Sequence, residues 1–278
     1  MSKKSARITA GILGGLALIP AATLFLTAPE KPTPAMKKPF FRRNIAHRGL
    51  HTPDRSIPEN SLAAFRRAAE KGYAIELDVQ LTKDGQVVVF HDDTVDRVCH
   101  GSVGRVDSYN YLDLRELRIE ETDEYIPLFF EVLETVGGRV PLLVELKTTK
   151  NRKELCEKTQ ALLDRYNGEY CIESFDPMIV KWYRKNAPEV MRGQLAAPAD
   201  GYIKSGKPPI LSFILSHCLF NFLTRPHFIA YEIGRRPLTV RLAAACGALL
   251  FGWTARDREG EKDNDGMIFE HYEPEHYY

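Results

Sequence analysis

Beyond residue 43, the chain alternates short apolar runs typical of β-strands with longer segments in which apolar positions recur every three or four residues. The strand-like runs cover residues 44–47, 74–79, 87–91, 141–146, 170–175, 190–195, 228–232, 249–254 and 266–269. The helix-like segments cover residues 59–71, 128–136, 151–166, 177–186 and 237–246. Such an alternation predicts an α/β fold with a parallel sheet and right-handed helical crossovers.

One junction is too short for a crossover. Only a few residues around Lys83-Asp84-Gly85 separate the runs at 74–79 and 87–91, and Asp-Gly is a strong hairpin signal. The run at 87–91 is therefore predicted to return antiparallel. Eight parallel strands remain, which is the number that closes a (β/α)8 TIM barrel of about 250 residues. The polar stretch 92–127 then becomes a small insertion after the strand that ends at His91.

The length of the hairpin loop decides where His91 points. A two-residue loop would place His91 opposite Asp78, and a four-residue loop would place it opposite Glu76. In both cases the alternation of side chains along a strand puts these three residues on one face of the ribbon. A bulged three-residue loop would put His91 on the other face.

The N-terminal 28 residues have a different pattern. Residues 8–28 form a run of 21 residues without a charged side chain, and Lys3, Lys4 and Arg7 precede it. About 20 apolar residues cross a bilayer. Because Leu26-Thr27-Ala28 fits a signal cleavage site poorly, we expect a retained single-pass anchor in the cell membrane rather than a cleaved signal. The short N-terminal tail favours a folded domain on the extracytoplasmic side.

Two further segments bear on how the domain meets a membrane. Residues 29–42 carry four prolines and predict a stiff linker, which leaves residues 43–278 as the folded domain. The apolar stretch 210–223 is too short to span a bilayer. It is either a buried helix of the barrel or a surface helix that faces lipid beside the mouth of the barrel.

Charge and cysteine content exclude other classes of protein. The formal net charge is +1, which gives no reason to expect a nucleic-acid partner. The five cysteines show no paired spacing, so neither a zinc site nor a disulfide framework is supported.

Three acids lie inside apolar strands. Glu76 and Asp78 are two residues apart on one strand and therefore share a face, and Glu145 lies in the apolar run Leu-Val-Glu-Leu-Lys. One such acid alone is more often salt-bridged or exposed, but three favour a common site. Carboxylate oxygens are hard ligands, so the set predicts one divalent cation, Mg²⁺ or Ca²⁺. Lys147 shares the face of Glu145 and would bind a phosphate oxygen or pair with an acid.

Two histidines end strands near these acids. His47 closes the first strand, where a TIM barrel carries its catalytic groups, and Arg48 beside it suits bidentate phosphate binding. His91 closes the hairpin. Two histidines can cleave a phosphodiester when one accepts a proton from the nucleophile and the other donates one to the leaving oxygen. Either histidine alone would be equally consistent with a structural role.

Other residues are weaker candidates. Glu59 opens the first helix beside Asn60-Ser61, one of which is the expected N-cap, and reaches the site only if its loop lines the barrel mouth. Glu173 and Trp253 lie on later strands and would complete the pocket or simply pack in the barrel. The remaining histidines are interpreted as structural or exposed: His51, His100, His217, His227, His271 and His276.

As a set, these motifs resemble those of the glycerophosphodiester phosphodiesterase family, over about residues 43–274. The N-terminal motifs are Ala46-His47-Arg48-Gly49, Glu59-Asn60, Glu76-Leu77-Asp78-Val79, Thr82-Lys83-Asp84-Gly85 and Val89-Phe90-His91-Asp92. The later motifs are Glu145-Leu146-Lys147, Gly252-Trp253-Thr254 and Asp265-Gly266-Met267-Ile268. One departure is that Phe269-Glu270-His271-Tyr272 stands where the family usually has Thr-Asp-Arg-Pro.

The resemblance implies a TIM barrel with an insertion after the histidine-bearing strand. It implies a divalent metal on Glu76, Asp78 and Glu145, and an acid–base pair of His47 and His91. It further implies phosphate contacts from Arg48 and Lys147. Substrate contacts from Glu59 and Trp253 are expected from their places at the mouth.

The expected reaction is hydrolysis of a glycerophosphodiester, small or lipid-derived, to glycerol 3-phosphate and an alcohol. In the family a neighbouring glycerol hydroxyl attacks first, and water then opens the cyclic phosphate. An alternative is phospholipase D-like cleavage of a lysophospholipid or sphingolipid, which predicts a wide apolar mouth. A non-catalytic binding barrel is a third reading, against which the full set of histidines and acids argues.

Overall fold

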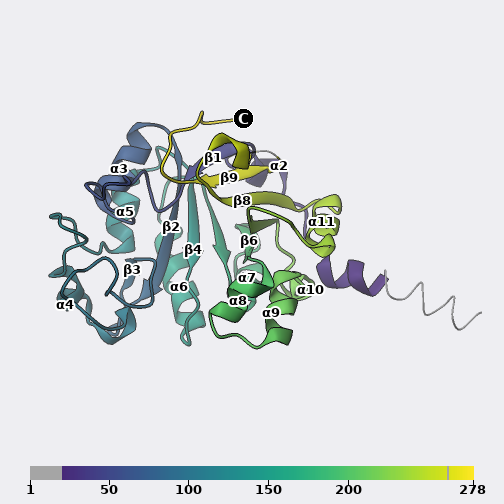
Figure 1. The fold of residues 1–278 in the computed structure, drawn as a ribbon, viewed down its shortest axis with the longest axis horizontal. Helices are drawn as coiled ribbons and strands as arrows, with labels where there is room; N and C mark the ends of the chain where they lie inside the picture. The colour runs from purple at the N-terminus through teal and green to yellow at the C-terminus, as the bar shows by residue number, and fades with distance from the viewer. Residues whose placement is uncertain (1–20, 262) are drawn as a thin grey trace, which may run out of the picture.

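Eight parallel strands form a closed barrel in the computed structural model, which describes residues 21–261 and 263–278 (Figure 1). The strands are β1 (Arg43–Ala46), β2 (Ala74–Leu81), β4 (Leu142–Leu146), β5 (Tyr170–Ser174), β6 (Met191–Ala196), β7 (Phe228–Glu232), β8 (Leu249–Ala255) and β9 (Gly266–Phe269). Strand β1 pairs with both β9 and β2, which closes the sheet. The predicted eight-stranded barrel is confirmed.

All five predicted helices are present around the barrel. They are α3 (Leu62–Glu70), α5 (Phe129–Val136), α6 (Arg152–Leu163), α7 (Pro177–Asn186) and α11 (Leu238–Ala245). The start of α3 shows how the sequence sets such a boundary. The Ser61 side chain accepts a hydrogen bond from the Ala64 backbone N–H, as an N-cap does. One face of this helix, with Phe65 and Ala68, is buried against the barrel.

Side chains along β2 alternate between the two sides of the barrel wall. Ile75, Leu77 and Val79 pack outward against the helices, whereas Ala74 packs inside the barrel with residues such as Leu143 and Ile268. Glu76 and Asp78 share the inward side with Ala74. The alternation therefore directs two acids into the barrel near its mouth, the end at which the parallel strands finish.

The hairpin prediction was wrong in its register. Strand β3 (Val87–Val89) pairs antiparallel with β2, and Val79 lies opposite Val89. The Thr82 backbone N–H donates to the Gln86 carbonyl, so the loop contains three residues, the case that we expected to turn His91 away from the acids. Backbone pairing with β2 continues only to Phe90, whose N–H donates to the Asp78 carbonyl, and His91, the next residue, lines the pocket at the mouth of the barrel.

The insertion at residues 92–127 has a small core of its own. It contains a 3-10 helix, η1 (Val106–Ser108), and the short helix α4 (Tyr111–Arg115). Val95, Leu114 and Ile119 are fully buried in its core. In the view of Figure 1 the insertion lies to the left of the barrel, away from α8 (Ala199–Lys204) and α9 (Pro209–Ser216) on the right.

The apolar stretch 210–223 does not form one helix. Helix α9 covers its first half, and after a turn at Cys218, which has a positive φ of 51°, α10 (Asn221–Thr224) covers its end. Leu215 is buried, whereas Ile210 is 78% exposed and Phe213 is 52% exposed. Of the two alternatives for this stretch, a fully buried barrel helix does not describe the outer face of α9.

The chain before β1 contacts the barrel. Residues 8–20 of the expected anchor lie outside the described residues, and residues 21–27 are helical. Among the described residues, no helix combines the length and apolar character that crossing a membrane requires. Residues 29–42, predicted as a linker, lie against the barrel and include α2 (Pro34–Lys37). Phe40 is buried in the barrel core, and Glu30 pairs with the buried Arg192. A short 3-10 helix, η2 (Arg258–Glu261), connects β8 and β9.

Candidate active site

A pocket of about 480 Å³ opens where the strands of the barrel end. It brings together residues that are far apart in the sequence and that we had predicted as site residues: His47, Arg48, Glu59, Glu76, His91, Glu145 and Trp253. Asp78 and Lys147, the other two, lie deeper and contact the residues of this pocket. All nine predicted site residues therefore belong to one region.

The three acids converge in the floor of the pocket. One carboxylate oxygen each of Glu76, Asp78 and Glu145 lies within 4.8 Å of the other two, and all three side chains are buried. Burial, together with the neighbouring carboxylates, raises the pKa of Glu76 well above its ordinary value. Clustering of buried carboxylates is unfavourable unless a cation offsets it, so this donor set fits a hard divalent ion.

Lys147 offsets part of this negative charge. Its Nζ lies 3.0 Å from Asp78 Oδ1 and 2.9 Å from Glu145 Oε1. Although burial acts in the opposite direction, Lys147 and neighbouring cations hold the pKa of Asp78 well below its ordinary value. Lys147 thus pairs with acids in this structure, one of the two roles that the sequence left open.

The loop after β1 folds tightly over the acids. The Arg48 backbone N–H donates to Glu76 Oε2 at 2.8 Å, and the Arg48 guanidinium lies between Glu59 and Asp78. Gly49 has a φ of 79°, and a Cβ there would lie 2.9 Å from that of Ala64. Only glycine fits this close approach to α3, so the His-Arg-Gly order has a steric cause.

His47 is oriented by a carboxylate from the far end of the chain. Its Nδ1 lies 2.7 Å from Glu270 Oε2, while its Nε2 faces Glu76 Oε2 at 4.0 Å. Burial lowers the pKa of His47 below its ordinary value, and the bond with Glu270 opposes part of this effect. The carboxylate therefore fixes the ring so that Nε2 points toward the acids.

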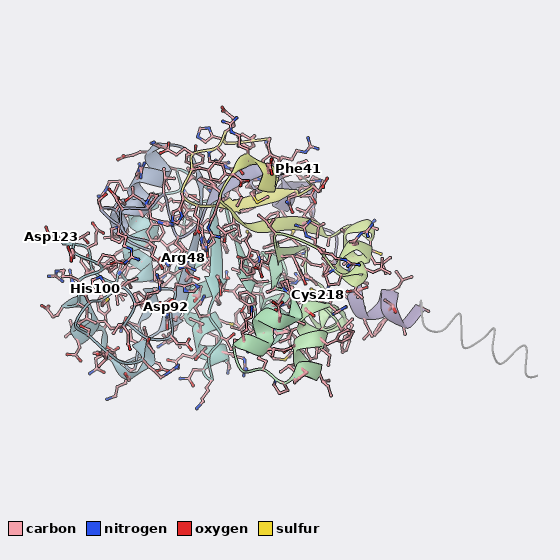
Figure 2. All side chains as sticks on the ribbon, viewed as in Figure 1. Phe41, Arg48, Asp92, His100, Asp123 and Cys218 are labelled. Atoms are coloured by element: carbon pink, nitrogen blue, oxygen red, sulfur yellow. The ribbon has the colours of Figure 1, made fainter. Side chains whose placement is uncertain are left out.

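His91 is oriented by its own neighbour. Its Nδ1 lies 2.6 Å from Asp92 Oδ1, and Asp92 is held by Arg97. Arg97 also pairs with Glu59, which pairs with Arg48, so alternating charges run from one histidine to the loop of the other. Figure 2 labels Arg48 and Asp92, the two ends of this chain of charges. Burial alone would raise the pKa of Glu59. The hydrogen bonds that Glu59 accepts from Arg97 and Arg48 outweigh this effect and lower its pKa to about 2.

The sequence matches the model of the Glycerophosphoryl diester phosphodiesterase family over residues 47–270. The chain belongs to this family.

Named relatives agree with this assignment. The glycerophosphodiester phosphodiesterase of Caldanaerobacter subterraneus is 38% identical over 162 residues, which are 54% of this chain and 65% of the relative. A human lysophospholipase D is 31% identical over 183 residues, which are 61% of this chain and 55% of the relative. The chain thus spans just under two thirds of the first of these relatives.

A solved structure shows the same fold. The phosphodiesterase of Oleispira antarctica, solved in complex with the product sn-glycerol-3-phosphate, aligns with a TM-score of 0.68 at 22% identity. The alignment covers 85% of this chain and 95% of that one.

Four residues of this site had no role, or only a structural role, in the prediction from the sequence. Asn60 was weighed only as a helix cap, yet its Nδ2 donates to Asp78 Oδ2 at 2.9 Å, and Ser61 is the cap. Glu270 was noted only as a departure from the usual family motif. Asp92 and Arg97 were assigned no role. Adjacency to His91 was an available signal for Asp92, but none in the sequence pairs Glu270 with His47.

A second cavity adjoins the pocket that contains the two histidines and the acids. It has a volume of about 640 Å³ and lies beneath α8 and α9. Apolar and aromatic side chains line much of it: Phe175, Ala197, Tyr202, Leu211, Leu215, Phe220 and Trp253. Phe175 and Trp253 line both cavities, and their rings meet edge to face at 5.8 Å. The Trp253 Nε1 is buried there without a hydrogen-bond partner among the described residues.

Proposed function

We propose that this protein hydrolyses glycerophosphodiesters to glycerol 3-phosphate and an alcohol, with one divalent cation and two histidines as the acid–base pair. The observation that carries the proposal is the placement of two carboxylate-oriented histidines beside a buried acid triad. Family membership supports the same substrate class.

The proposed chemistry assigns each group a task. Glu76, Asp78 and Glu145 would hold the cation, which polarises the phosphoryl group when bound. Arg48 would bind a phosphate oxygen. One histidine takes the proton of the glycerol hydroxyl as its oxygen attacks phosphorus, and the other protonates the departing alcohol. The cyclic phosphate is then opened by water with the two roles exchanged.

Metal add-back tests this function. The purified protein, stripped with EDTA, should lose turnover of glycerophosphocholine and recover it with Mg²⁺ or Ca²⁺ supplied singly, with glycerol 3-phosphate as the product. Turnover that persists in excess chelator would remove the metal from the proposal. Absence of hydrolysis with every cation would remove the activity.

A second candidate substrate is a lysophospholipid, which is cleaved by the same chemistry. The apolar cavity beneath α8 and α9 supports it, because an acyl chain there would join a headgroup in the catalytic pocket past Phe175 and Trp253. The burial of each methylene contributes about 0.8 kcal/mol. With monomeric lysophosphatidylcholines, kcat/KM should therefore rise about tenfold for every two carbons added. Equal kcat/KM for all chain lengths would exclude the cavity as an acyl site.

We also propose that the protein works at the cell membrane, with the catalytic domain on the extracytoplasmic side. The uncharged run at residues 8–28 supports an anchor. The exposed Ile210 and Phe213 of α9 support contact with lipid beside the mouth. Fractionation with protease protection of the full chain tests both parts, and recovery of the protein in the soluble fraction would contradict the anchor.

A further inference from the structure

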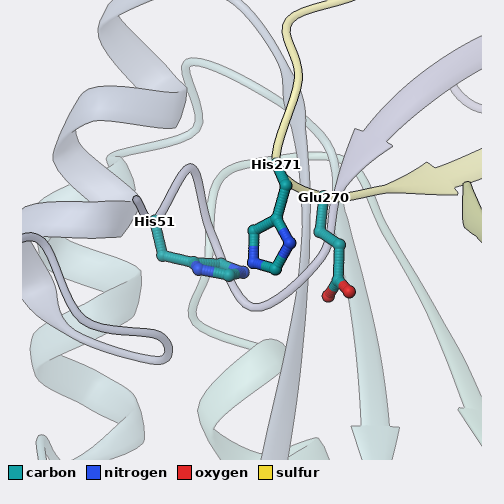
Figure 3. Close-up of side chains that lie close together, drawn as sticks. All are labelled: His51, Glu270 and His271. Atoms are coloured by element: carbon teal, nitrogen blue, oxygen red, sulfur yellow. The ribbon is translucent and has the colours of Figure 1, made fainter. Parts of the chain in front are cut away.

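A second group of metal-binding side chains lies at the rim of the catalytic pocket. It consists of His51, Glu270 and His271 (Figure 3), and one donor atom from each lies within 4.8 Å of the other two. His51 belongs to the loop after β1, and the other two follow β9. The two segments meet because β1 and β9 are paired, with Ala46 opposite Phe269. The barrel closure itself therefore assembles the group.

Two details of this group suit a ligand-binding role. The Nε2 atom of His51 is buried and has no hydrogen-bond partner among the described residues, which is costly for an imidazole nitrogen. His271 has a φ of 66°, a conformation that is uncommon outside glycine and that clusters at functional sites. The two imidazole rings lie with their centroids 5.2 Å apart, edge to face.

We propose that His51, Glu270 and His271 form a second metal site, which takes a transition-metal ion of the Zn²⁺ class. Two imidazoles and one carboxylate are the ligand set of catalytic zinc sites that keep a fourth position open. Imidazole nitrogens favour Zn²⁺, whereas an all-carboxylate set favours Mg²⁺ or Ca²⁺. The two sites of this protein would thus select different cations. From the sequence, His51 and His271 were expected to be structural or exposed, and His271 is exposed; the proposal adds a metal-binding role for both.

Glu270 connects the second site to the catalytic histidine. Its Oε2 faces His47 Nδ1 at 2.7 Å, and its Oε1 lies 2.6 Å from Arg256, whose side chain is 67% exposed. Because a carboxylate offers about four lone-pair positions, Glu270 can bind a cation and keep its bond with His47. Arg256 pairs with Glu270 in this structure and, because most of its side chain is exposed, would turn into solvent when a cation binds. His47 would then lie between the acid triad and the second metal.

Calorimetry with two matched sets of variants tests the proposal. Wild-type protein saturated with Ca²⁺ should still bind one equivalent of Zn²⁺. His51→Ala and His271→Ala should each weaken Zn²⁺ binding by on the order of a hundredfold or more, while Ca²⁺ binding stays unchanged. Glu76→Gln should weaken Ca²⁺ binding and leave Zn²⁺ binding unchanged. His100→Ala is the matched control, since His100 pairs with Glu120 outside this group.

The outcomes separate this proposal from the proposed hydrolysis. Zn²⁺ binding that survives both His51→Ala and His271→Ala, or that Ca²⁺ displaces, would place Zn²⁺ elsewhere and overturn the second site. Co²⁺ offers an independent readout, because four-coordinate Co²⁺ with imidazole ligands absorbs visible light. That absorption should disappear in the two histidine variants and persist in Glu76→Gln. None of these measurements depends on turnover, so a protein inactive toward glycerophosphodiesters would still confirm or exclude the metal site.

Discussion

The two cavities at the barrel mouth differ in the kind of side chain that lines them. The catalytic pocket contains histidines, acids and arginines that are tied to each other by ion pairs. The neighbouring cavity is larger and is lined chiefly by apolar and aromatic groups from α8, α9 and three strand ends. Phe175 and Trp253 belong to both. Under the proposed function, the polar side of the mouth would carry out the hydrolysis, and the apolar side would select the group that is attached to the phosphate.

The largest expected loss of activity follows the removal of either histidine from the polar pocket. His47→Ala and His91→Ala should each lower kcat by about 10²- to 10⁴-fold for glycerophosphocholine and lysophosphatidylcholine alike, because both substrates need the same proton transfers. Product release followed by mass spectrometry measures the loss, and an unchanged thermal midpoint shows that the fold persists. Near-normal turnover by either variant would withdraw that histidine from the acid–base pair.

A smaller loss, still on the polar side, should follow Glu270→Gln. We expect kcat/KM to fall by about tenfold to a hundredfold for both substrates, because the His47 ring loses its orienting carboxylate. Glu270 raises the pKa of His47, so its removal should move the limb of the kcat/KM pH profile that belongs to His47 toward lower pH. Asp92→Asn acts on His91 and should leave that limb in place. A loss of rate without movement of the limb would mean that Glu270 has only a structural role.

A substitution in the apolar cavity should change kcat/KM for one of the two substrates and not for the other. Leu211 lines the apolar cavity, and Leu211→Glu should lower kcat/KM for a long-chain lysophosphatidylcholine by about tenfold through lost apolar burial. Hydrolysis of glycerophosphocholine should not change. Ile210→Glu is the matched control, since Ile210 is the adjacent residue on α9 but does not line the cavity. Equal losses in both variants on monomeric substrate would argue against an acyl-binding cavity.

The smallest effect is expected for a substitution of Trp253, which lines both cavities. Trp253→Phe keeps an aromatic ring between the cavities but removes an indole N–H that has no partner among the described residues. If that group donates to the substrate, its loss should raise KM by about fivefold, the value of one hydrogen bond of about 1 kcal/mol. Steady-state kinetics on both substrates would show whether the bond serves the shared headgroup or only the lipid.

The sequence predicted the barrel and the acid triad because both follow from local patterns. Strand count came from apolar runs, and the shared face of Glu76 and Asp78 came from the alternation within one strand. The partner of His47 could not be found in this way, because Glu270 lies 223 positions away and meets it only when the barrel closes.

The hairpin shows a different limit. Asp84-Gly85 signals a tight turn but does not fix the number of residues in its loop, and a difference of one residue reverses the faces of a strand. The correct placement of His91 therefore depended on where β3 ends, which the apolar run Val87–Val89 and the following Phe90 do not reveal. The apolar cavity was equally hidden, because it forms between α8, α9 and distant strand ends.

The contacts of residues 28–40 with the barrel change what a minimal folded unit must contain. Glu30 pairs with Arg192, whose side chain is fully buried, and Phe40 fills the barrel core. A chain that begins at residue 43 would leave a buried guanidinium without its carboxylate and a void in the core, each a recognised cause of large destabilisation. The boundary of the domain is thus set by packing. Residues 28–40 are therefore part of the folded domain, and under the proposed membrane anchor no flexible linker would separate residue 28 from the barrel.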